Sequence, residues 1–121
     1  MIYGVGLDVS DNVRIRDAVE RWADKFLRRV FTEGEIKYCA AKVNSVESLS
    51  ARFAAKEAFI KAAGMGFSLT DIEVVPDAMG KPSLKLHGRA REAMINLGIT
   101  AAHVSLTHQR GISAAVVVLE G

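Results

Sequence analysis

The chain contains very little cysteine, proline or aromatic side chain, and it has no long apolar run. Its single cysteine, Cys39, excludes an internal disulfide framework and a cysteine-rich zinc site. The longest nearly apolar run covers residues 112–119, far short of the ~20 residues that a membrane-spanning helix needs. Positive and negative charges almost balance, with 16 Lys and Arg against 14 Asp and Glu. We therefore expect neither a membrane partner nor a nucleic-acid partner.

The length of 121 residues predicts one domain that covers residues 1–121. A domain this small buries a limited share of its surface, so oligomerisation is a plausible source of extra stability. The N-terminus lacks the positively charged region and the small-residue cleavage site of a secretory signal peptide, which predicts a cytoplasmic location.

The spacing of apolar and turn-forming residues predicts a mixture of helices and strands. Helices are expected at 12–30, 33–42, 46–63 and 88–97, and strands at 2–9, 71–75, 82–87, 103–107 and 112–119. Thr32 and Glu35 match a capping box, Ser45 and Ser48 are alternative caps for helix 46–63, and Gly64 ends that helix. The mixture favours an α+β fold in which an antiparallel sheet packs against helices on one side.

Helix 46–63 has a carboxylate at the edge of its apolar stripe. Val46, Leu49, Phe53 and Ile60 form the stripe at ~100° per residue, and Glu57 lies beside it. An ordinary explanation is an i, i+4 ion pair with Lys61, worth ~0.2–0.5 kcal/mol. The alternative is a carboxylate held for a divalent cation, with Lys61 aimed at an anion that the cation also binds. A second carboxylate would then come from Asp8, which could instead cap a helix.

Three blocks of sequence resemble the holo-acyl-carrier-protein synthases, the short, single-domain 4′-phosphopantetheinyl transferases. The first block is Gly6-Leu-Asp8-Val, with Arg14-Ile15 shortly after it. The second runs from Arg52 through Lys56-Glu57-Ala to Lys61-Ala-Ala-Gly64 and Gly66. The third combines Asp71-Ile-Glu-Val, Gly80-Lys-Pro82 and Val104-Ser-Leu-Thr-His108. The similarity covers nearly the whole chain in the right order, and the second block is its most specific part.

The resemblance implies a transfer of 4′-phosphopantetheine from coenzyme A to a serine of an apo acyl carrier protein, in fatty acid biosynthesis. Adenosine 3′,5′-bisphosphate is released and Mg²⁺ is required. The family's two metal carboxylates correspond to Asp8 and Glu57, and its helix lysine corresponds to Lys61. The proton acceptor for the serine stays open between a metal-bound water, Glu57 and Lys61.

The resemblance also implies residues that bind the two substrates. Coenzyme A is expected to contact Lys61, and also Arg52, Gly64, Lys81, Pro82 and His108, with His108 near the nucleotide 3′-phosphate. For Arg52, His108 and Lys81-Pro82 the ordinary alternatives are a surface arginine, a strand-end histidine and plain hairpin chemistry. The acidic carrier is expected to dock on Arg14, Arg21, Lys25 and Arg28, unless these belong to a mixed solvated face.

The short family members form trimers with active sites between subunits, so the resemblance implies a homotrimer. Asp8, Glu57 and Lys61 would come from one subunit and Lys81-Pro82 from the next, with residues 112–119 at the central contact. Two features depart from many members: residues 40–47 carry only one basic residue, Lys42, and the loop after Gly66 is short. The first departure argues against a phosphate contact from that segment. Two other functions stay open, a non-catalytic trimeric module that binds coenzyme A or a carrier, and a broader-range carrier-domain transferase.

Overall fold

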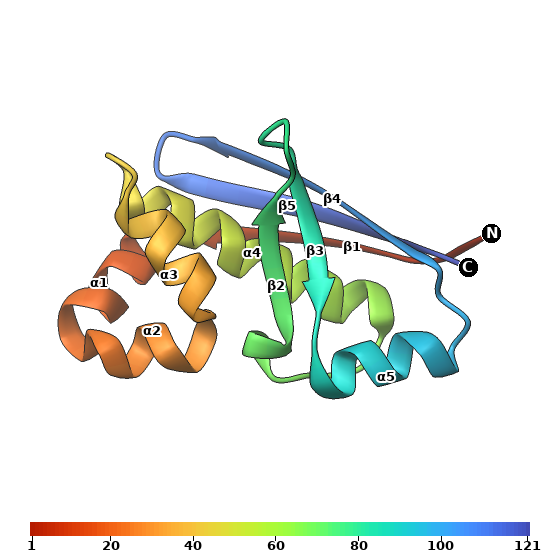
Figure 1. Cartoon of the computed structure of the whole chain (residues 1–121). Helices are drawn as coiled ribbons and strands as arrows, with labels where there is room; N and C mark the ends of the chain where they lie inside the picture. Colours follow the sequence, from red (N-terminus) through yellow and green to blue (C-terminus); the bar gives the residue numbers. More distant parts are fainter.

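The computed structural model describes all 121 residues of the chain as five α-helices, five strands and one short 3₁₀ helix. Figure 1 shows their arrangement. In chain order the elements are β1 (Ile2–Asp11), α1 (Asn12–Trp22), α2 (Asp24–Val30), α3 (Glu33–Ala40), α4 (Ser45–Ala63), η1 (Leu69–Asp71), β2 (Ile72–Pro76), β3 (Pro82–Leu86), α5 (Gly88–Asn96), β4 (Ala101–Gln109) and β5 (Ile112–Glu120). The expected α+β class is confirmed, and no helix combines the length and the apolar character that crossing a bilayer requires.

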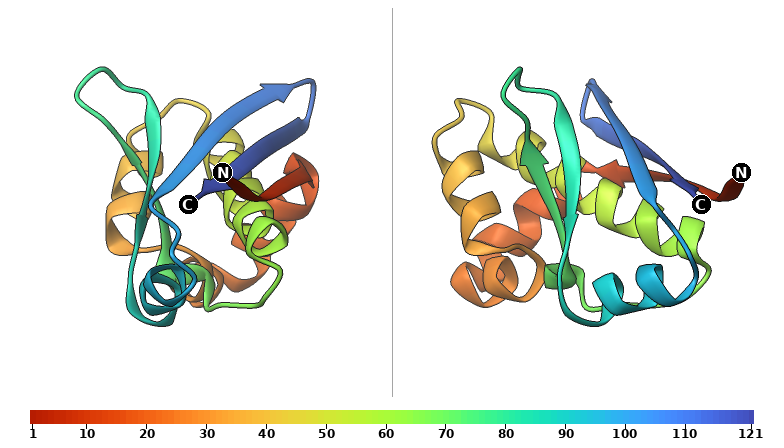
Figure 2. Two further views of the ribbon diagram at one scale, coloured as in Figure 1. Left: turned by 90° about the vertical axis from the view of Figure 1, so that its right-hand side faces the viewer. Right: turned by 45° about the vertical axis from the view of Figure 1, so that its right-hand side comes forward.

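The strands form two antiparallel sheets where one was expected. β1, β5 and β4 form a three-stranded sheet in that order, and β2 pairs only with β3. The β2–β3 hairpin and the larger sheet diverge toward their tips (Figure 2). β3 contacts β4 without joining its hydrogen-bond ladder, so the hairpin remains a separate sheet.

Helix α4 is the centre of the molecule, and it contacts β1, β5, β4 and β2 as well as α1 and α3. The expected apolar stripe is only partly right, because Leu49 is buried whereas Val46, Phe53 and Ile60 are half-buried. Six of the eleven buried residues of α4 are alanines: Ala51, Ala54, Ala55, Ala58, Ala62 and Ala63. Small side chains let strands and helices approach α4 from several sides, which a single amphipathic stripe would not allow.

Two glycines let β1 lie directly on α4. A Cβ atom at Gly6 would stand 1.8 Å from the carbonyl oxygen of Ala58, and one at Gly4 would stand 2.0 Å from that of Ala62. Further along the strand, the Ser50 hydroxyl donates a hydrogen bond of 3.0 Å to the buried Ser10 hydroxyl. Alternate residues of β1 therefore face α4, since successive side chains of a strand point to opposite faces.

The opposite face of the three-stranded sheet is apolar and exposed on two of its strands. Val5, Leu7 and Val9 of β1 are 59%, 62% and 61% exposed. Val5 pairs with Val118 and Leu7 with Val116 of β5, both half-buried. We call these five residues the outer valine face. Nothing in a single chain covers it, and contiguous exposed apolar surface of this kind usually marks an interaction site.

The expected helix over 12–30 is wrong, because the chain forms two helices there. Ala23 separates α1 from α2 with a φ of 46° and a ψ of −125°. A non-glycine residue at positive φ is uncommon and ends the helical hydrogen-bond pattern. The break redirects the chain so that Phe26 meets Phe31 edge-on, with ring centroids 6.1 Å apart.

The predicted helix ends are confirmed in part. Thr32 and Glu35 form the expected capping box at the start of α3, and Gly64 ends α4 in the left-handed conformation. The expected serine caps of α4 are wrong, because Asn44 occupies the cap position and makes no side-chain capping bond. Asp11 caps α1 by accepting a 2.9 Å hydrogen bond from the backbone N–H of Val13.

The contact of β1 with α4 predicts that Gly6→Ala is strongly destabilising. The added methyl group would meet the Ala58 carbonyl, which is helix backbone and cannot move aside, so we expect a loss of about 3 kcal/mol, the upper end of the usual cost of overpacking. Gly66→Ala is the matched control, because a Cβ there meets no atom within 4 Å. Urea denaturation of both variants measures the difference, and equal stabilities would contradict the proposed close contact.

Candidate active site

Asp8 and Lys61 form an ion pair where β1 crosses α4. Asp8 follows Gly4 and Gly6 on the helix-facing side of β1, and its side chain is 15% exposed. The Lys61 ammonium lies 3.0 Å from Asp8 Oδ1 and donates a second hydrogen bond of 3.1 Å to the Leu7 carbonyl. The structure therefore brings together two of the predicted site residues that are 53 positions apart.

Glu57 lies one helical turn before Lys61 and is half-buried. It takes part in none of the ion pairs of the structure, so the Glu57–Lys61 pair considered above is not formed. The alternative role of Asp8 as a helix cap is also wrong, because Asp11 is the cap of α1. Asp8 and Glu57 thus present carboxylate oxygens, which are the ligands that Mg²⁺ prefers, and the donor set fits this ion.

A cavity of about 480 Å³ lies beside the N-terminal half of α4. It is bounded by the end of α3, the α3–α4 loop, the tip of the β2–β3 hairpin and the end of β4. Three predicted coenzyme A residues, Arg52, Pro82 and His108, line this one cavity. Lys81 and Gly64 do not line it, and Lys81 borders a smaller cavity of about 200 Å³ with His103.

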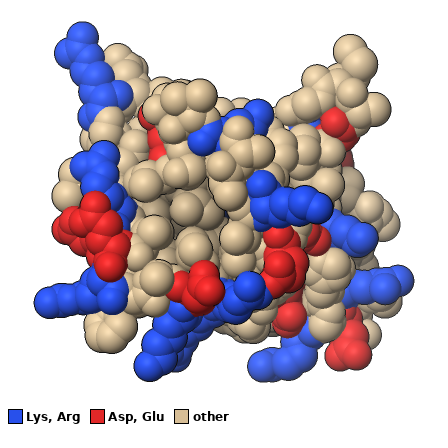
Figure 3. Space-filling view, turned by 60° about the vertical axis from the view of Figure 1, so that its left-hand side comes forward, with Lys and Arg blue, Asp and Glu red and all other residues tan.

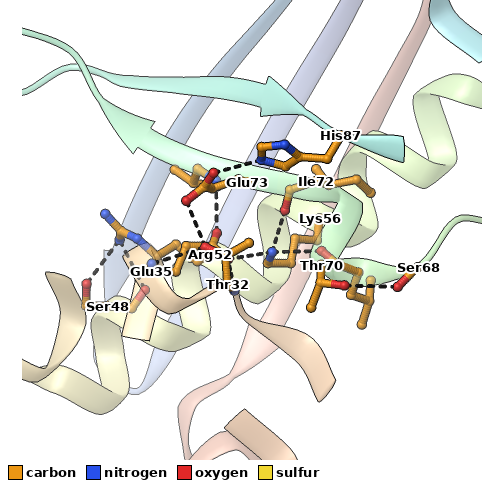
Figure 4. A network of polar contacts seen from close by, with 12 residues as sticks. Thr32, Glu35, Ser48, Arg52, Lys56, Ser68, Thr70, Ile72, Glu73 and His87 are labelled. Carbon is orange, nitrogen blue, oxygen red and sulfur yellow. Dashed lines mark hydrogen bonds and ion pairs between the residues drawn. The ribbon is translucent and has the colours of Figure 1, made fainter. Parts of the chain in front are cut away.

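Arg52 is a buried cation without an anionic partner. It is only 6% exposed, so it is not the surface arginine considered above. Its hydrogen bonds within the chain come from Nη1, which donates to the Ser48 hydroxyl at 3.0 Å and to the Ser48 carbonyl at 3.3 Å (Figure 4). Its Nε is buried and has no hydrogen-bond partner. Because a buried unpaired charge is costly, this guanidinium is suited to an anion that enters the cavity.

Two further polar groups border the cavity. The His108 imidazole contacts the Glu47 carboxylate across it, from the end of β4 to the first turn of α4. Lys42 also lines the cavity, although the sequence argued against a phosphate contact from its segment. Lys42 was not expected in the site, because the residues around it are uncharged. Its position shortly before the helix that carries Arg52 is the feature of the sequence that could have indicated it.

The carboxylates and the cavity lie on opposite edges of the three-stranded sheet. Asp8 belongs to β1 and His108 to β4, and β5 separates the two strands. Along α4, Arg52 is five residues before Glu57, so at ~100° per residue the two side chains point to clearly different sides. One chain therefore contains both halves of the predicted site without joining them.

The predicted carrier-binding residues lie on the surface of α1 and α2. Arg14, Arg21, Lys25 and Arg28 are all exposed. Figure 3 shows that basic side chains on the face turned to the viewer have acidic ones among them. Arg28, for example, forms an ion pair with Glu33. The surface of α1 and α2 therefore carries charges of both signs, and its basic residues outnumber its acidic ones.

Sequence reasoning missed a buried ion pair on the side of α4 that faces α3 and β2. The Lys56 ammonium lies 2.7 Å from Glu35 Oε1, and both side chains are fully buried. Lys56 also donates to the carbonyl oxygens of Leu69, at 2.8 Å, and Ile72. Burial lowers the pKa of Lys56 from its ordinary value, and the Glu35 carboxylate opposes this effect. The sequence gives no local signal for this pair, because the two partners lie 21 positions apart.

The ion pair continues into a chain of polar contacts. Glu35 Oε2 accepts the backbone N–H of Val74 at 2.9 Å, and the Thr32 hydroxyl donates to Glu73 at 2.8 Å. His87 Nε2 lies 2.9 Å from the other oxygen of Glu73. Burial alone would raise the pKa of Glu73, but the hydrogen bonds from His87 and Thr32 outweigh it and hold the pKa below its ordinary value. The network joins α3, α4 and β2 (Figure 4).

Comparison with known proteins identifies the family. A model of the 4′-phosphopantetheinyl transferase superfamily matches residues 4–116. The chain belongs to this superfamily. The holo-[acyl-carrier-protein] synthase of Syntrophus aciditrophicus is 45% identical over 125 residues, which cover 100% of this chain and 98% of the relative.

Solved holo-acyl-carrier-protein synthases share the whole fold. The crystal structure of the Neisseria meningitidis enzyme matches with a TM-score of 0.93 and 32% identity, over 100% of both chains. The Helicobacter pylori enzyme, solved in complex with coenzyme A, has a TM-score of 0.82 and 32% identity. That match covers 96% of this chain and 99% of the other. The resemblance inferred from the three sequence blocks is therefore confirmed.

The two buried cations of α4 predict very different effects of the same substitution on stability. Lys56→Met leaves the Glu35 carboxylate buried without its partner, and we expect a loss of about 3–5 kcal/mol. Arg52→Met removes a buried charge that has no carboxylate partner, and we expect stability within about 1 kcal/mol of the parent chain, or above it. Urea denaturation of both variants without ligand tests this, and a greater loss for Arg52→Met would contradict it.

Proposed function

We propose that the chain is a Mg²⁺-dependent holo-acyl-carrier-protein synthase that acts in fatty acid biosynthesis in the cytoplasm. It transfers 4′-phosphopantetheine from coenzyme A to a serine of apo acyl carrier protein and releases adenosine 3′,5′-bisphosphate. The observation that carries the proposal is the placement of Asp8, Lys61 and Glu57 where β1 crosses α4, in a chain of this superfamily. Phosphoryl-type transfer needs mainly positioning and neutralisation of charge, which these residues supply.

The residues divide the chemistry between them. Asp8 and Glu57 would hold Mg²⁺, which when bound neutralises charge on the diphosphate of coenzyme A. Lys61 neutralises charge on the transferred phosphoryl group, since its side chain is 55% exposed and therefore accessible to a substrate. Neither carboxylate oxygen of Glu57 takes part in an ion pair. We therefore assign to Glu57 the role of the base that accepts the proton of the acceptor serine. Arg52 and His108 bind the nucleotide end.

The carboxylate site predicts a loss of transfer from changes that keep side-chain shape. Asp8→Asn and Glu57→Gln should each reduce turnover at least about 100-fold, because a neutral amide is a poor ligand for Mg²⁺. Glu92→Gln, on the exposed face of α5, is the matched control. The intact mass of an apo acyl carrier protein after incubation with coenzyme A and Mg²⁺ measures transfer.

The same assay separates the proposed enzyme from the other functions. A parent chain that binds coenzyme A but never changes the mass of any carrier would be the non-catalytic module. A chain that modifies carrier domains of peptide synthases as fast as acyl carrier protein would be the broader-range transferase. Near-normal turnover by Asp8→Asn at limiting Mg²⁺ would contradict the proposal that Asp8 and Glu57 together hold the ion.

We assign carrier docking to the basic surface of α1 and α2, because its exposed basic residues outnumber its acidic ones and acyl carrier proteins are acidic. Arg14→Glu should raise the KM for the carrier by about tenfold and leave the KM for coenzyme A nearly unchanged. Added salt should weaken carrier binding by the parent chain, since exposed charges are screened over ~10 Å at 0.1 M. Steady-state kinetics measure both KM values. An unchanged KM for the carrier would show that the carrier does not dock on α1 and α2.

We also propose a homotrimer with shared active sites. Two features of a single chain support it: the exposed outer valine face, and the placement of carboxylates and nucleotide cavity on opposite edges of one sheet. Head-to-tail packing around a threefold axis joins the β1 edge of one subunit to the β4 edge of the next. The central contact expected at residues 112–119 then includes Val116 and Val118 of β5, together with β1.

The trimer predicts complementation between two inactive variants. Sedimentation equilibrium should give three chains per particle. Asp8→Asn and Arg52→Met chains, each inactive alone, should regain activity when refolded together, at about a quarter of the sites for an equal mixture. Each active site would combine the carboxylates of one chain with the cavity of its neighbour. An active monomer, or mixtures with no activity above the separate variants, would refute the shared site.

A further inference from the structure

One aromatic ring on the wall of the cavity contacts both of its cations that lack a carboxylate partner. The centroid of the Tyr38 ring lies 4.5 Å from Cζ of Arg52 and 4.6 Å from Nζ of Lys42. Tyr38 belongs to the last turn of α3, Lys42 to the following loop and Arg52 to α4. The ring therefore connects three segments that border the cavity. Its hydroxyl makes none of the side-chain hydrogen bonds of the structure.

An aromatic partner affects a buried guanidinium differently from a carboxylate. The negative face of the ring attracts the cation without cancelling its charge, and it leaves the N–H donors free. This agrees with the hydrogen bonds of Arg52, whose Nε has no partner. On the same helix, Lys56 is neutralised by Glu35 and donates to two carbonyl oxygens as well. Lys56 also lies 5.6 Å from an aromatic ring, that of Phe31, so the two cations differ in the carboxylate, and only Arg52 keeps its charge available to a ligand.

The other charges of the cavity leave a positive excess. Glu47 is the one carboxylate on its wall, and His108 is paired with it. Arg52 and Lys42 then remain, both in contact with the Tyr38 ring, and two cations on one cavity suit a phosphomonoester dianion. In the proposed function the diphosphate of coenzyme A lies at Asp8 and Glu57. The anion that reaches this cavity is therefore the 3′-phosphate.

We propose that Tyr38 is a positioning residue for recognition of the 3′-phosphate of coenzyme A, because its ring holds Arg52 and Lys42 in place with their charges uncancelled. The inference rests on the proposed function and adds to it a residue that selects coenzyme A over 3′-dephospho-coenzyme A. Tyr38 acts through the two cations and does not itself touch the reacting atoms.

The test compares Tyr38→Leu with Tyr38→Phe, which keeps the ring and loses only a hydroxyl that has no partner. Tyr38→Leu should raise the KM for coenzyme A about three- to tenfold, with kcat changed by less than about twofold. Its KM for 3′-dephospho-coenzyme A should stay within about twofold of the parent value, and Tyr38→Phe should match the parent with both donors. Titration calorimetry with adenosine 3′,5′-bisphosphate and with adenosine 5′-monophosphate gives the same comparison without turnover. Thermal melting accompanies both, and Tyr38→Met replaces Tyr38→Leu if that variant does not fold.

The outcomes separate this inference from the proposed function. If the parent chain neither modifies a carrier nor binds adenosine 3′,5′-bisphosphate, the proposed function itself fails. If the parent chain does both, the inference is overturned by equal losses for the two donors, by Tyr38→Phe losing as much as Tyr38→Leu, or by no loss at all. A loss confined to ligands that carry the 3′-phosphate, with Tyr38→Phe unaffected, supports it.

Discussion

The direct contact between β1 and α4 determines where the chemistry of this protein lies. Gly4 and Gly6 allow the strand backbone to rest on the helix backbone, and the pleat then points Asp8 to the same side. The opposite side of the same strand receives Val5, Leu7 and Val9. One constraint therefore brings Asp8 to Lys61 and also creates the exposed apolar face. A shift of β1 by one residue would exchange the two sides and remove both features.

The rotation of α4 about its axis is fixed from the other side by the pair of Glu35 and Lys56. Lys56 is bound to α3 and to the start of β2, so the helix cannot turn without breaking a buried ion pair. Glu57 is the next residue, ~100° further around the helix, and is directed away from that network. The buried pair is thus no part of the proposed metal site and still determines which way Glu57 points. A buried pair serves here to select one orientation, and its net contribution to stability is a separate matter.

The parts of this structure that depend on neighbouring residues could be predicted from the sequence. The capping box of Thr32 and Glu35 and the end of α4 at Gly64 are local signals, and both are confirmed. The break at Ala23 could not be predicted, because no glycine, asparagine or proline marks it. Nor could the burial of Lys56, because a lysine on a helix is normally exposed and its partner is distant in sequence. Asp8, Glu57 and Lys61 were found through the family resemblance, whereas periodicity alone left their roles open.

A single chain contains two features that are unfavourable in free energy, one at the proposed ligand contact and one at the proposed subunit contact. Arg52 is buried without a counter-charge, and the outer valine face lies in water. A small domain has little surplus stability with which to offset either cost. An anion in the cavity would remove the first cost and a neighbouring subunit the second. Because the cavity and the carboxylates lie on opposite edges of one sheet, the subunit arrangement that covers the valines can also assemble the site. Ligand binding and association would then stabilise the same state, and each should strengthen the other.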